Sequence, residues 1–462
     1  MSRNIEERIV DIRRSIWKIF VLNISGEYII YNPLDRLVCK CNKDMAELIS
    51  LMKKSDISDD EILRSISDNE RHVAINYLIN IVKPSGISYE EFLEMEKKLE
   101  GINDNSLSLH SMALIPTYKC NLRCIYCYSR GGEKNISMSW KIAKASIDFF
   151  LTHRNREVEP MITFHGGGEP TLCFELVKNA TEYIKEKLRS EKITMAIVTN
   201  GVFPLYKAEW IAENMDYVLV SFDGPKDIHD FHRPFPNGKG SYKYVVRTIK
   251  YLVNRGINVV IGATITEHSI YRMKEIIDQC ALLGVNEIEM QPLAICGRCY
   301  DTMLKPLNGE EYAKYLSNVI SYAEELGITI GYALSRLGKI RLRHCHASGL
   351  GICVTPEGII TTCVESTDCT DPNSDAFILG KYNGSDFVLD YDKFEMLRRR
   401  IVDNIPKCKG CFCKWHCGGG CPAQAYRENG DIFKPSRFWC EFMKSLMKYH
   451  ILNLLKKKSI HS

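Results

Sequence analysis

Cysteine constrains this chain more than any other residue. The sequence has 19 cysteines, and ten of them lie between residues 345 and 462. Only two precede residue 120, and a tight group follows at Cys120, Cys124 and Cys127. A secreted disulfide scaffold would be short and would carry a signal peptide. This chain has 462 residues, and residues 1–14 mix both charge signs without an apolar run. We therefore expect a cytoplasmic protein with reduced thiols that ligate a metal ion or a metal cluster.

Length and charge narrow the class of protein further. A chain of 462 residues predicts about two to four domains. The 61 Lys and Arg nearly balance the 57 Asp and Glu, so nothing predicts a nucleic-acid partner. No stretch approaches about 18 consecutive apolar residues, so we expect no membrane span.

The first predicted domain covers residues 1–107 and has short strands followed by helices. Apolar runs at 19–24, 27–31 and 37–41 predict strands, with turn residues between them. Helical periodicity follows at 44–53, 59–67 and 70–82, and Ser58 to Glu61 resembles a capping box at the start of the second. The polar cluster 103–106 predicts a linker. This pattern indicates a small α+β domain.

The second predicted domain, 108–330, alternates strands and helices. Six repeats of this kind predict parallel strands covered by helices, in an α/β fold. Either an open doubly wound sheet or a partial barrel satisfies the pattern, and in both the chemistry lies at the carboxyl ends of the strands. The predicted strands are 112–116, 161–165, 194–199, 217–222, 258–264 and 286–291, and the predicted helices include 139–152, 174–189, 243–255 and 271–283.

The third predicted domain, 331–462, is rich in cysteine and irregular. Short strands are expected at 351–355 and 358–362, around a turn at 356–358, and a helix is expected at 441–456. A small irregular domain of this kind can gain folding energy from metal ligation.

Three thiols fall within eight residues directly after the first predicted strand of the second domain, at Cys120, Cys124 and Cys127. Structural zinc sites normally use four ligands in two pairs. A loop with three thiolates instead leaves one metal position open, as a cubane iron–sulfur cluster with an exogenous ligand requires. A zinc site and three merely buried thiols are the alternatives.

This loop resembles the hallmark of the radical S-adenosylmethionine (SAM) superfamily, a Cys-x3-Cys-x2-Cys loop with an aromatic residue before the third Cys. Tyr126 stands in that aromatic place. The resemblance implies a partial (β/α)6 barrel similar to a TIM barrel. It also implies a [4Fe–4S] cluster on Cys120, Cys124 and Cys127 whose fourth iron chelates SAM.

Other strand ends carry residues that the resemblance assigns to SAM binding. In 165–170, His-Gly-Gly-Gly-Glu-Pro resembles the motif that receives the SAM ammonium group. No Arg for the SAM carboxylate stands near the fifth strand. The pair His229 and His232 lacks a metalloprotease pattern and is expected to lie on the surface or beside the substrate. The residues that the resemblance implies for SAM binding are Tyr126, Gly167, Gly168, Glu169, Asn200, Ser221, Asp223 and Gln291.

The C-terminal cysteines have a specific spacing: Cys-x12-Gly-x4-Cys, then Cys-x2-Cys-x5-Cys-x3-Cys, then a final Cys. This is similar to the SPASM extension of radical SAM enzymes, which holds two auxiliary iron–sulfur clusters. The resemblance implies two sets of ligands. The first auxiliary set is Cys345, Cys363 and Cys421, with Cys353 as the candidate fourth ligand and Cys296 and Cys299 as competitors. The second auxiliary set is Cys408, Cys411, Cys417 and Cys440.

The resemblance also implies the chemistry. An electron from a partner such as ferredoxin or flavodoxin reduces the first cluster, SAM is cleaved, and a 5′-deoxyadenosyl radical abstracts hydrogen from the substrate. We expect a maturase that modifies a peptide or protein, with the N-terminal domain as a possible leader-recognition domain. No catalytic side chain beyond the cluster ligands is assigned.

Three other functions stay open. One is oxidation of the anaerobic sulfatase-maturating type, although Val364, and not Asp, follows Cys363. Another is tailoring of a tetrapyrrole or other small molecule. The last is a non-catalytic iron–sulfur electron-transfer protein, which is expected to tolerate Glu169→Ala and Asp223→Ala.

Overall fold

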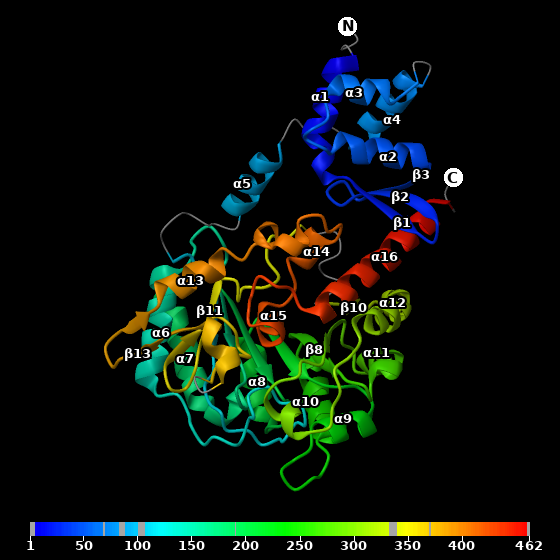
Figure 1. The fold of residues 1–462 in the computed structure, drawn as a ribbon. Coiled ribbons are helices and arrows are strands. Elements are labelled where there is room, and N and C mark those ends of the chain that lie inside the picture. The colour runs from blue at the N-terminus through cyan, green and yellow to red at the C-terminus, as the bar shows by residue number, and fades with distance from the viewer. Residues whose placement is uncertain are drawn as a thin grey trace.

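A computed structural model of the chain describes residues 5–67, 70–82, 88–99, 107–189, 191–331, 340–368 and 371–459. The expected linker at 103–106 lies outside these ranges. A small N-terminal unit lies at one end of the molecule and a large sheet with its helices at the other, and the long C-terminal helix α16 runs between them (Figure 1).

A mostly parallel sheet organises the larger part. Among the described residues it has eleven strands, in the order β10-β9-β8-β7-β6-β5-β4-β11-β12-β13-β14. The strands from β4 to β10 pair in parallel with their successors along the chain without a reversal. A doubly wound sheet would reverse its order, so the predicted partial barrel is confirmed. These strands are β4 (Ser111–Leu114), β5 (Met161–Phe164), β6 (Thr194–Thr199), β7 (Tyr217–Ser221), β8 (Asn258–Ile265), β9 (Glu287–Pro292) and β10 (Thr329–Ile330).

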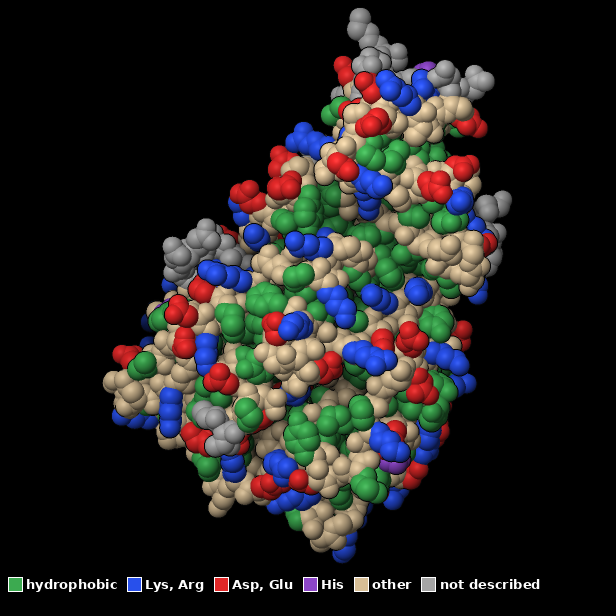
Figure 2. Space-filling view, viewed as in Figure 1, with side chains coloured by type: hydrophobic (Ala, Val, Ile, Leu, Met, Phe, Trp, Pro, Cys, Tyr) green, Lys and Arg blue, Asp and Glu red, His purple; other side chains and the backbone are tan. Residues whose placement is uncertain are grey.

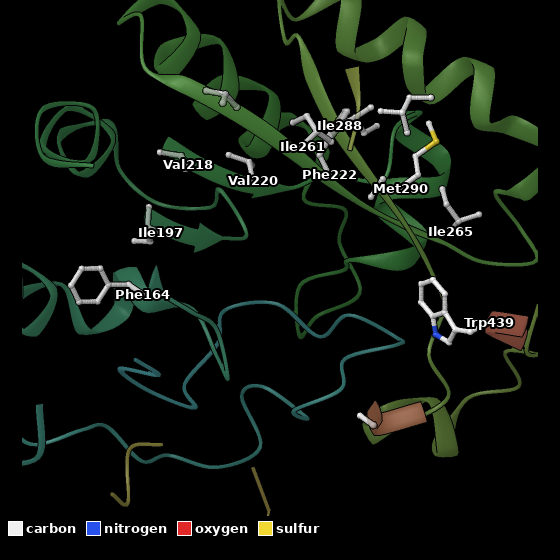
Figure 3. Close-up of a cluster of buried hydrophobic side chains, with 14 of the residues drawn as sticks. Phe164, Ile197, Val218, Val220, Phe222, Ile261, Ile265, Ile288, Met290 and Trp439 are labelled. Atoms are coloured by element: carbon white, nitrogen blue, oxygen red, sulfur yellow. The ribbon is translucent and has the colours of Figure 1, made fainter. Parts of the chain in front are cut away.

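Helices cover this sheet and exclude water from its apolar side chains. The layer between the sheet and its helices includes Ile197, Val218 and Ile261, all fully buried (Figure 3). Capping residues start several of the helices, since the side chain of Ser139 accepts from Ile142 N and that of Asn308 from Glu311 N. The helices are α6 (Trp140–His153), α7 (Phe174–Leu188), α8 (Leu205–Asn214), α9 (Lys226–His232), α10 (Tyr242–Asn254), α11 (Met273–Leu282) and α12 (Gly309–Glu325).

The C-terminal strands continue the same sheet. Strand β11 (Gly351–Val354) pairs in parallel with β4, with Gly351 opposite Ser111. Strands β12 (Ile359–Thr361), β13 (Ile378–Tyr382) and β14 (Phe387–Leu389) follow antiparallel. The sequence predicted the first two of these strands but not that they would extend the barrel. Pairing with β11 satisfies the backbone groups that β4 would otherwise leave exposed at the sheet edge.

The N-terminal unit is a separate three-stranded sheet with its own helices. Strands β1 (Phe20–Ile24), β2 (Glu27–Asn32) and β3 (Leu37–Cys41) form antiparallel pairs. Ser58 and Glu61 make the expected capping box. Helices α1 and α5 were not predicted. The helices of this part of the chain are α1 (Ile5–Ser15), α2 (Lys43–Met52), α3 (Asp59–Arg64), α4 (Arg71–Val82) and α5 (Tyr89–Leu99).

An aromatic cluster joins the N-terminal unit to the cysteine-rich region. Trp415 is 1% exposed and contacts the rings of Trp17, Phe20 and Phe92 at centroid distances of 5.5, 5.8 and 5.7 Å. Tyr31 Oη lies 2.6 Å from His416 Nε2. The N-terminal unit therefore packs directly on the second auxiliary set. The C-terminal helices are α13 (Tyr391–Arg398), α14 (Lys414–Cys417), α15 (Pro422–Asn429) and α16 (Arg437–Ser459).

Charged side chains of both signs are intermixed over the face in Figure 2, as the nearly balanced composition predicts. Within the described part of the chain, no helix combines the length and apolarity needed to cross a membrane.

Candidate active site and metal centres

A cavity of about 530 Å³ lies inside the barrel. Cys124 and Cys127 line one part of it, and Cys345, Cys353 and Cys363 line another. Residues of the predicted SAM-cluster site and of the predicted first auxiliary site therefore line one cavity.

The cluster loop, Cys120 to Cys127, follows β4 and is held by its backbone. Arg123 N donates to Pro234 O at 2.7 Å, and Ile125 N donates to His232 O at 3.0 Å. Burial raises the pKa of the Cys124 thiol to about 12, and Arg233 opposes this rise. A thiol in such a site gives up its proton when a metal binds.

Hydrogen-bond donors point at the sulfur atoms of the cluster loop. Gly131 N lies 3.2 Å from Cys127 Sγ, and Ser129 Oγ lies 3.4 Å from the same sulfur. Asn200 Nδ2 donates to Cys120 Sγ at 3.7 Å. Donors of this kind stabilise sulfur that carries negative charge, so the site fits a thiolate-bound cluster.

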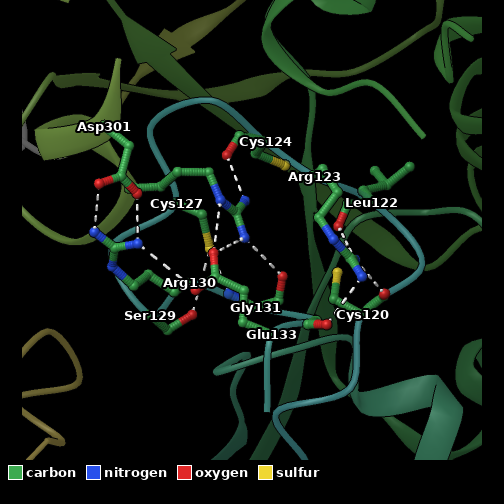
Figure 4. Close-up of polar contacts among 12 residues, drawn as sticks. Cys120, Leu122, Arg123, Cys124, Cys127, Ser129, Arg130, Gly131, Glu133 and Asp301 are labelled. Carbon is green, nitrogen blue, oxygen red and sulfur yellow. Dashed lines mark hydrogen bonds and ion pairs between the residues drawn. The ribbon is translucent and has the colours of Figure 1, made fainter. Parts of the chain in front are cut away.

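Two side chains of the segment 296–301 contact residues in and just after the cluster loop, and Figure 4 labels one of them, Asp301, beside Arg130. Arg298 donates to Cys124 O at 2.7 Å and to Gly131 O at 3.0 Å, and it pairs with Glu133. Arg130 forms an outer ion pair with Asp301. Gly297 has a left-handed φ of +55°, and a Cβ there would meet Tyr128 O at 2.2 Å. The segment that contains Cys296 and Cys299 thus holds the loop in place, a role that sequence reasoning did not find.

Glu169 ties the loops after β5 and β6 together behind the cavity. It is 1% exposed and accepts from Thr171 Oγ1 at 2.7 Å, Thr199 Oγ1 at 2.8 Å and Asn200 N at 2.8 Å. Gly168 N donates to Thr117 O at 2.8 Å. The Glu169 carboxylate and the N–H of Gly168 already form hydrogen bonds within the protein. The role of Gly167, Gly168 and Glu169 in binding the SAM ammonium group therefore stays a prediction.

Asp223 is the centre of a second buried network. Its carboxylate accepts from the Tyr126 hydroxyl, from Arg233 Nε at 3.0 Å and from Thr264 N at 3.0 Å, and His232 Nδ1 lies 3.1 Å away. Burial alone would raise the pKa of Asp223, but Arg233 and His232 hold it well below its ordinary value.

The expectation that His229 and His232 lie on the surface or beside the substrate is wrong. Both are 0% exposed and do not line the cavity. His229 Nδ1 accepts from Asp223 N at 3.3 Å, and His232 Nε2 lies 3.0 Å from Thr266 Oγ1. One turn of α9 thus presents both imidazoles to the strand ends.

The predicted SAM residues divide into two groups. Tyr126, Ser221 and Gln291 line the cavity, whereas the other five lie behind its wall and are Gly167, Gly168, Glu169, Asn200 and Asp223. Sequence reasoning missed Arg233 and Glu365, which do line it. The signal for Arg233 was its place directly after His232, ten residues beyond Asp223.

The first auxiliary set is brought together around Glu365. Cys345, Cys421 and Glu365 all act electrostatically on Cys363, whose pKa is raised chiefly by burial. Glu365 pairs with Arg427 Nη2 at 2.7 Å. Cys353 lines the same cavity but packs on Ile115 and Tyr118, and its role as fourth ligand stays a prediction.

The second auxiliary set surrounds a smaller cavity near the start of α16. All four predicted cysteines line it, and so does a fifth, Cys413. Cys413 Sγ lies 3.3 Å from Cys411 Sγ. The cysteine spacing did not assign a role to Cys413.

Two buried arginines indicate that anionic groups belong beside these thiols. Arg400 Nη1 and Arg427 Nη1 are buried without a hydrogen-bond partner among the described residues. Cysteines of the first auxiliary set interact electrostatically with both guanidinium groups. The donor chemistry therefore fits clusters held by thiolates.

Comparisons with known proteins agree with this geometry. The Radical SAM superfamily matches residues 114–280, which include the cluster loop and the strands from β5 to β8. This chain belongs to the radical SAM superfamily, whose members use a [4Fe–4S] cluster with SAM. The resemblance found in the sequence is confirmed, including its SPASM extension.

Individual relatives extend over most of the chain. The radical SAM cyclopropyl synthase TigE of Paramaledivibacter caminithermalis is 22% identical and aligns over 92% of each chain. A cysteine-type anaerobic sulfatase-maturating enzyme of Clostridium perfringens is 26% identical over 73% of this chain and 94% of its own. Streptococcus suis SuiB, solved with its precursor peptide SuiA, has a TM-score of 0.55 at 15% identity and covers 91% of this chain and 98% of its own. The last similarity shows a shared fold.

Proposed function

We propose that this radical SAM enzyme is a maturase that modifies a peptide or protein by hydrogen-atom abstraction. The single observation that carries the proposal is the cavity of about 530 Å³, which joins the cluster loop to the first auxiliary set. It has room for a substrate side chain between these two groups of cysteines. The names of TigE and of the sulfatase-maturating enzyme add support.

Cys120, Cys124 and Cys127 would hold the SAM-binding [4Fe–4S] cluster. That cluster, when bound and reduced, supplies the cleavage of SAM to methionine and a 5′-deoxyadenosyl radical that takes hydrogen from the substrate. The hydrogen bonds of Arg298 hold the backbone of the loop at Cys124 and at Gly131.

Charged side chains in the cavity wall can bind SAM and the substrate. Arg233 lines it beside Tyr126, with its guanidinium 5.2 Å from the ring centroid. We propose that Arg233 contacts the SAM carboxylate through Nη1, since its Nε and Nη2 bond Asp223 and no Arg stands near the end of β8. Ser221 and Gln291 would contact the nucleoside. Glu365 lines the same cavity and pairs with Arg427 at 2.7 Å.

We further propose a peptide partner and an electron donor such as ferredoxin or flavodoxin, in the cytoplasm. Every cysteine that the structure describes is a free thiol, as a reducing compartment favours. Strand β3 is an edge strand of the N-terminal sheet, so a leader peptide can bind there by adding a strand.

The test is SAM cleavage by the full chain, reconstituted with iron and sulfide without oxygen and reduced with dithionite. We expect 5′-deoxyadenosine by mass spectrometry, its loss in Cys124→Ala, and retained auxiliary-cluster signals in that variant. Cys280→Ala is the control, because Cys280 is buried in α11 away from the cavity. Cleavage by Cys124→Ala, or none by the wild type, would refute the assignment.

The same assay separates the alternatives. A non-catalytic electron-transfer protein would give no 5′-deoxyadenosine. A small-molecule enzyme would cleave SAM but would leave peptides encoded beside its gene unchanged in mass. An enzyme of the sulfatase-maturating type would oxidise a Cys or Ser in a sulfatase peptide.

A further inference from the structure

A fully buried guanidinium without an acidic partner lies near both auxiliary sets. Arg400 follows α13 and is 0% exposed. Its Nε donates to Ile432 O at 2.6 Å, and its Nη2 donates to Gly419 O at 2.9 Å. Its Nη1 has no partner, and no ion pair among the described residues includes it. The residues that the structure describes therefore offer no acceptor to the Nη1 amino group and no anion to the positive charge of Arg400.

The turn above Arg400 connects the two sets. Gly418, Gly419 and Gly420 have left-handed φ values of +61°, +82° and +72° and join Cys417 of the second auxiliary set to Cys421 of the first. A Cβ on Gly419 would lie 3.6 Å from Arg400 Nη1 and 3.7 Å from Nη2. The Arg400 guanidinium thus packs against the glycine turn that joins the two auxiliary sets.

Cysteines of both auxiliary sets interact electrostatically with Arg400. They are Cys345 and Cys421 of the first auxiliary set and Cys417 and Cys408 of the second.

An isolated buried charge costs several kcal/mol unless an opposite charge lies close by. Cysteines that ligate iron are thiolates, and a cubane cluster with its thiolates is anionic. Two clusters beside Arg400 would supply the missing negative charge. A sulfur atom would also give Nη1 an acceptor.

We infer that Arg400 is the shared counter-charge of the two auxiliary clusters and raises the reduction potentials of both. Arg400 is a positioning residue, since it acts through the clusters and not on the substrate. The inference rests on the proposed function in one respect, namely that both sets hold clusters. Its consequence is electrostatic: a fixed cation favours the more negative, reduced state of a nearby cluster.

The test uses the full chain with Cys120→Ala, Cys124→Ala and Cys127→Ala, so that only auxiliary clusters are present. Arg400→Gln and Arg400→Lys are compared with this background by anaerobic potentiometric titration followed by electron paramagnetic resonance. The matched control is Arg398→Gln. Arg398 lies two residues earlier and is also buried, at 6% exposed, but it is paired with Glu395 at 2.7 Å.

We expect Arg400→Gln to lower the affinity of each cluster for an electron about tenfold, which is about 59 mV for a one-electron couple. Arg400→Lys keeps the charge and should shift both potentials less. Arg398→Gln should shift neither.

Unchanged potentials in Arg400→Gln, or a shift in one cluster alone, would overturn the inference. If Arg400→Gln loses auxiliary iron, the iron content of Arg400→Lys distinguishes the two explanations. Iron retained in Arg400→Lys supports the need for a positive charge at this position. Loss of iron in both variants overturns the inference. A background protein without auxiliary iron would instead refute the cluster assignment itself and remove the basis of the inference.

Discussion

Replacing Arg298 by methionine tests how the cluster loop is held. Arg298 donates to Cys124 O at 2.7 Å and to Gly131 O at 3.0 Å, and its side chain is only 12% exposed. Hydrogen bonds from a charged donor contribute about 1.5–3 kcal/mol each, so Arg298→Met should cost the loop about 3–6 kcal/mol. Because about 1.4 kcal/mol is a factor of ten, the loop should open at least about a hundredfold more often.

The measurement is the rate at which iron transfers from the protein to a chelator in the absence of oxygen. Only the iron of the cluster loop is counted, which is the iron that the Cys124→Ala variant lacks. We expect Arg298→Met to release this iron much faster than the wild type, with auxiliary iron unaffected. Glu133→Gln is the control, because it removes only the pair with Glu133, which is 43% exposed and contributes less than about 1 kcal/mol. Equal release by Arg298→Met and wild type would refute the clamp, and so would equal release by the two variants.

Three further predictions follow from buried groups. Asp223→Asn leaves Arg233 without its anionic partner and should lower the urea unfolding free energy by about 3–5 kcal/mol. Burial lowers the pKa of His229 to about 4, below about 6.5 for an unfolded His. The contribution of neutral His229 to the free energy of unfolding should therefore be complete above about pH 6.5. It should be lost, by about 3 kcal/mol, as the pH drops to about 4, and the loss should be smaller in His229→Gln. Cys411→Ala should lose the iron of one auxiliary cluster, whereas Cys413→Ala should keep it, by iron analysis.

Specific results would contradict each of these three predictions. An Asp223→Asn protein as stable as the wild type would show that the buried pair contributes nothing. An identical pH dependence in His229→Gln would assign the acid sensitivity to other groups. Full iron in Cys411→Ala would mean that Cys413, at 3.3 Å, replaces it as a ligand.

Hydrophobic periodicity predicted most elements of the fold to within a few residues. The predicted strand at 194–199 is β6 as observed, and the predicted helix at 174–189 is α7 with one residue fewer. Buried strands read as apolar runs and surface helices as a period of 3.6, so both are local signals. Helix α5 was missed because its apolar residues pack on Trp17 in a distant segment, which no local pattern reveals.

The candidate site was only partly predictable. Cysteine spacing is a local property and located the cluster loop. The surroundings of Glu169 and Asp223 were not local, because their partners come from the loops after other strands and from α9. The expectation that a non-catalytic protein would tolerate Glu169→Ala and Asp223→Ala therefore needs correction. Both carboxylates hold loops together, and both substitutions should destabilise any protein with this fold.

The pairing of β11 with β4 has a consequence for synthesis on the ribosome. Gly351 lies opposite Ser111, 240 positions earlier in the chain. The first barrel strand therefore has no outer neighbour to pair with until about 240 further residues have been translated, and pairing across such a distance is slow. The loop that follows this strand carries Cys120, Cys124 and Cys127, so these three thiols of a nascent chain should be most vulnerable to premature oxidation during that interval.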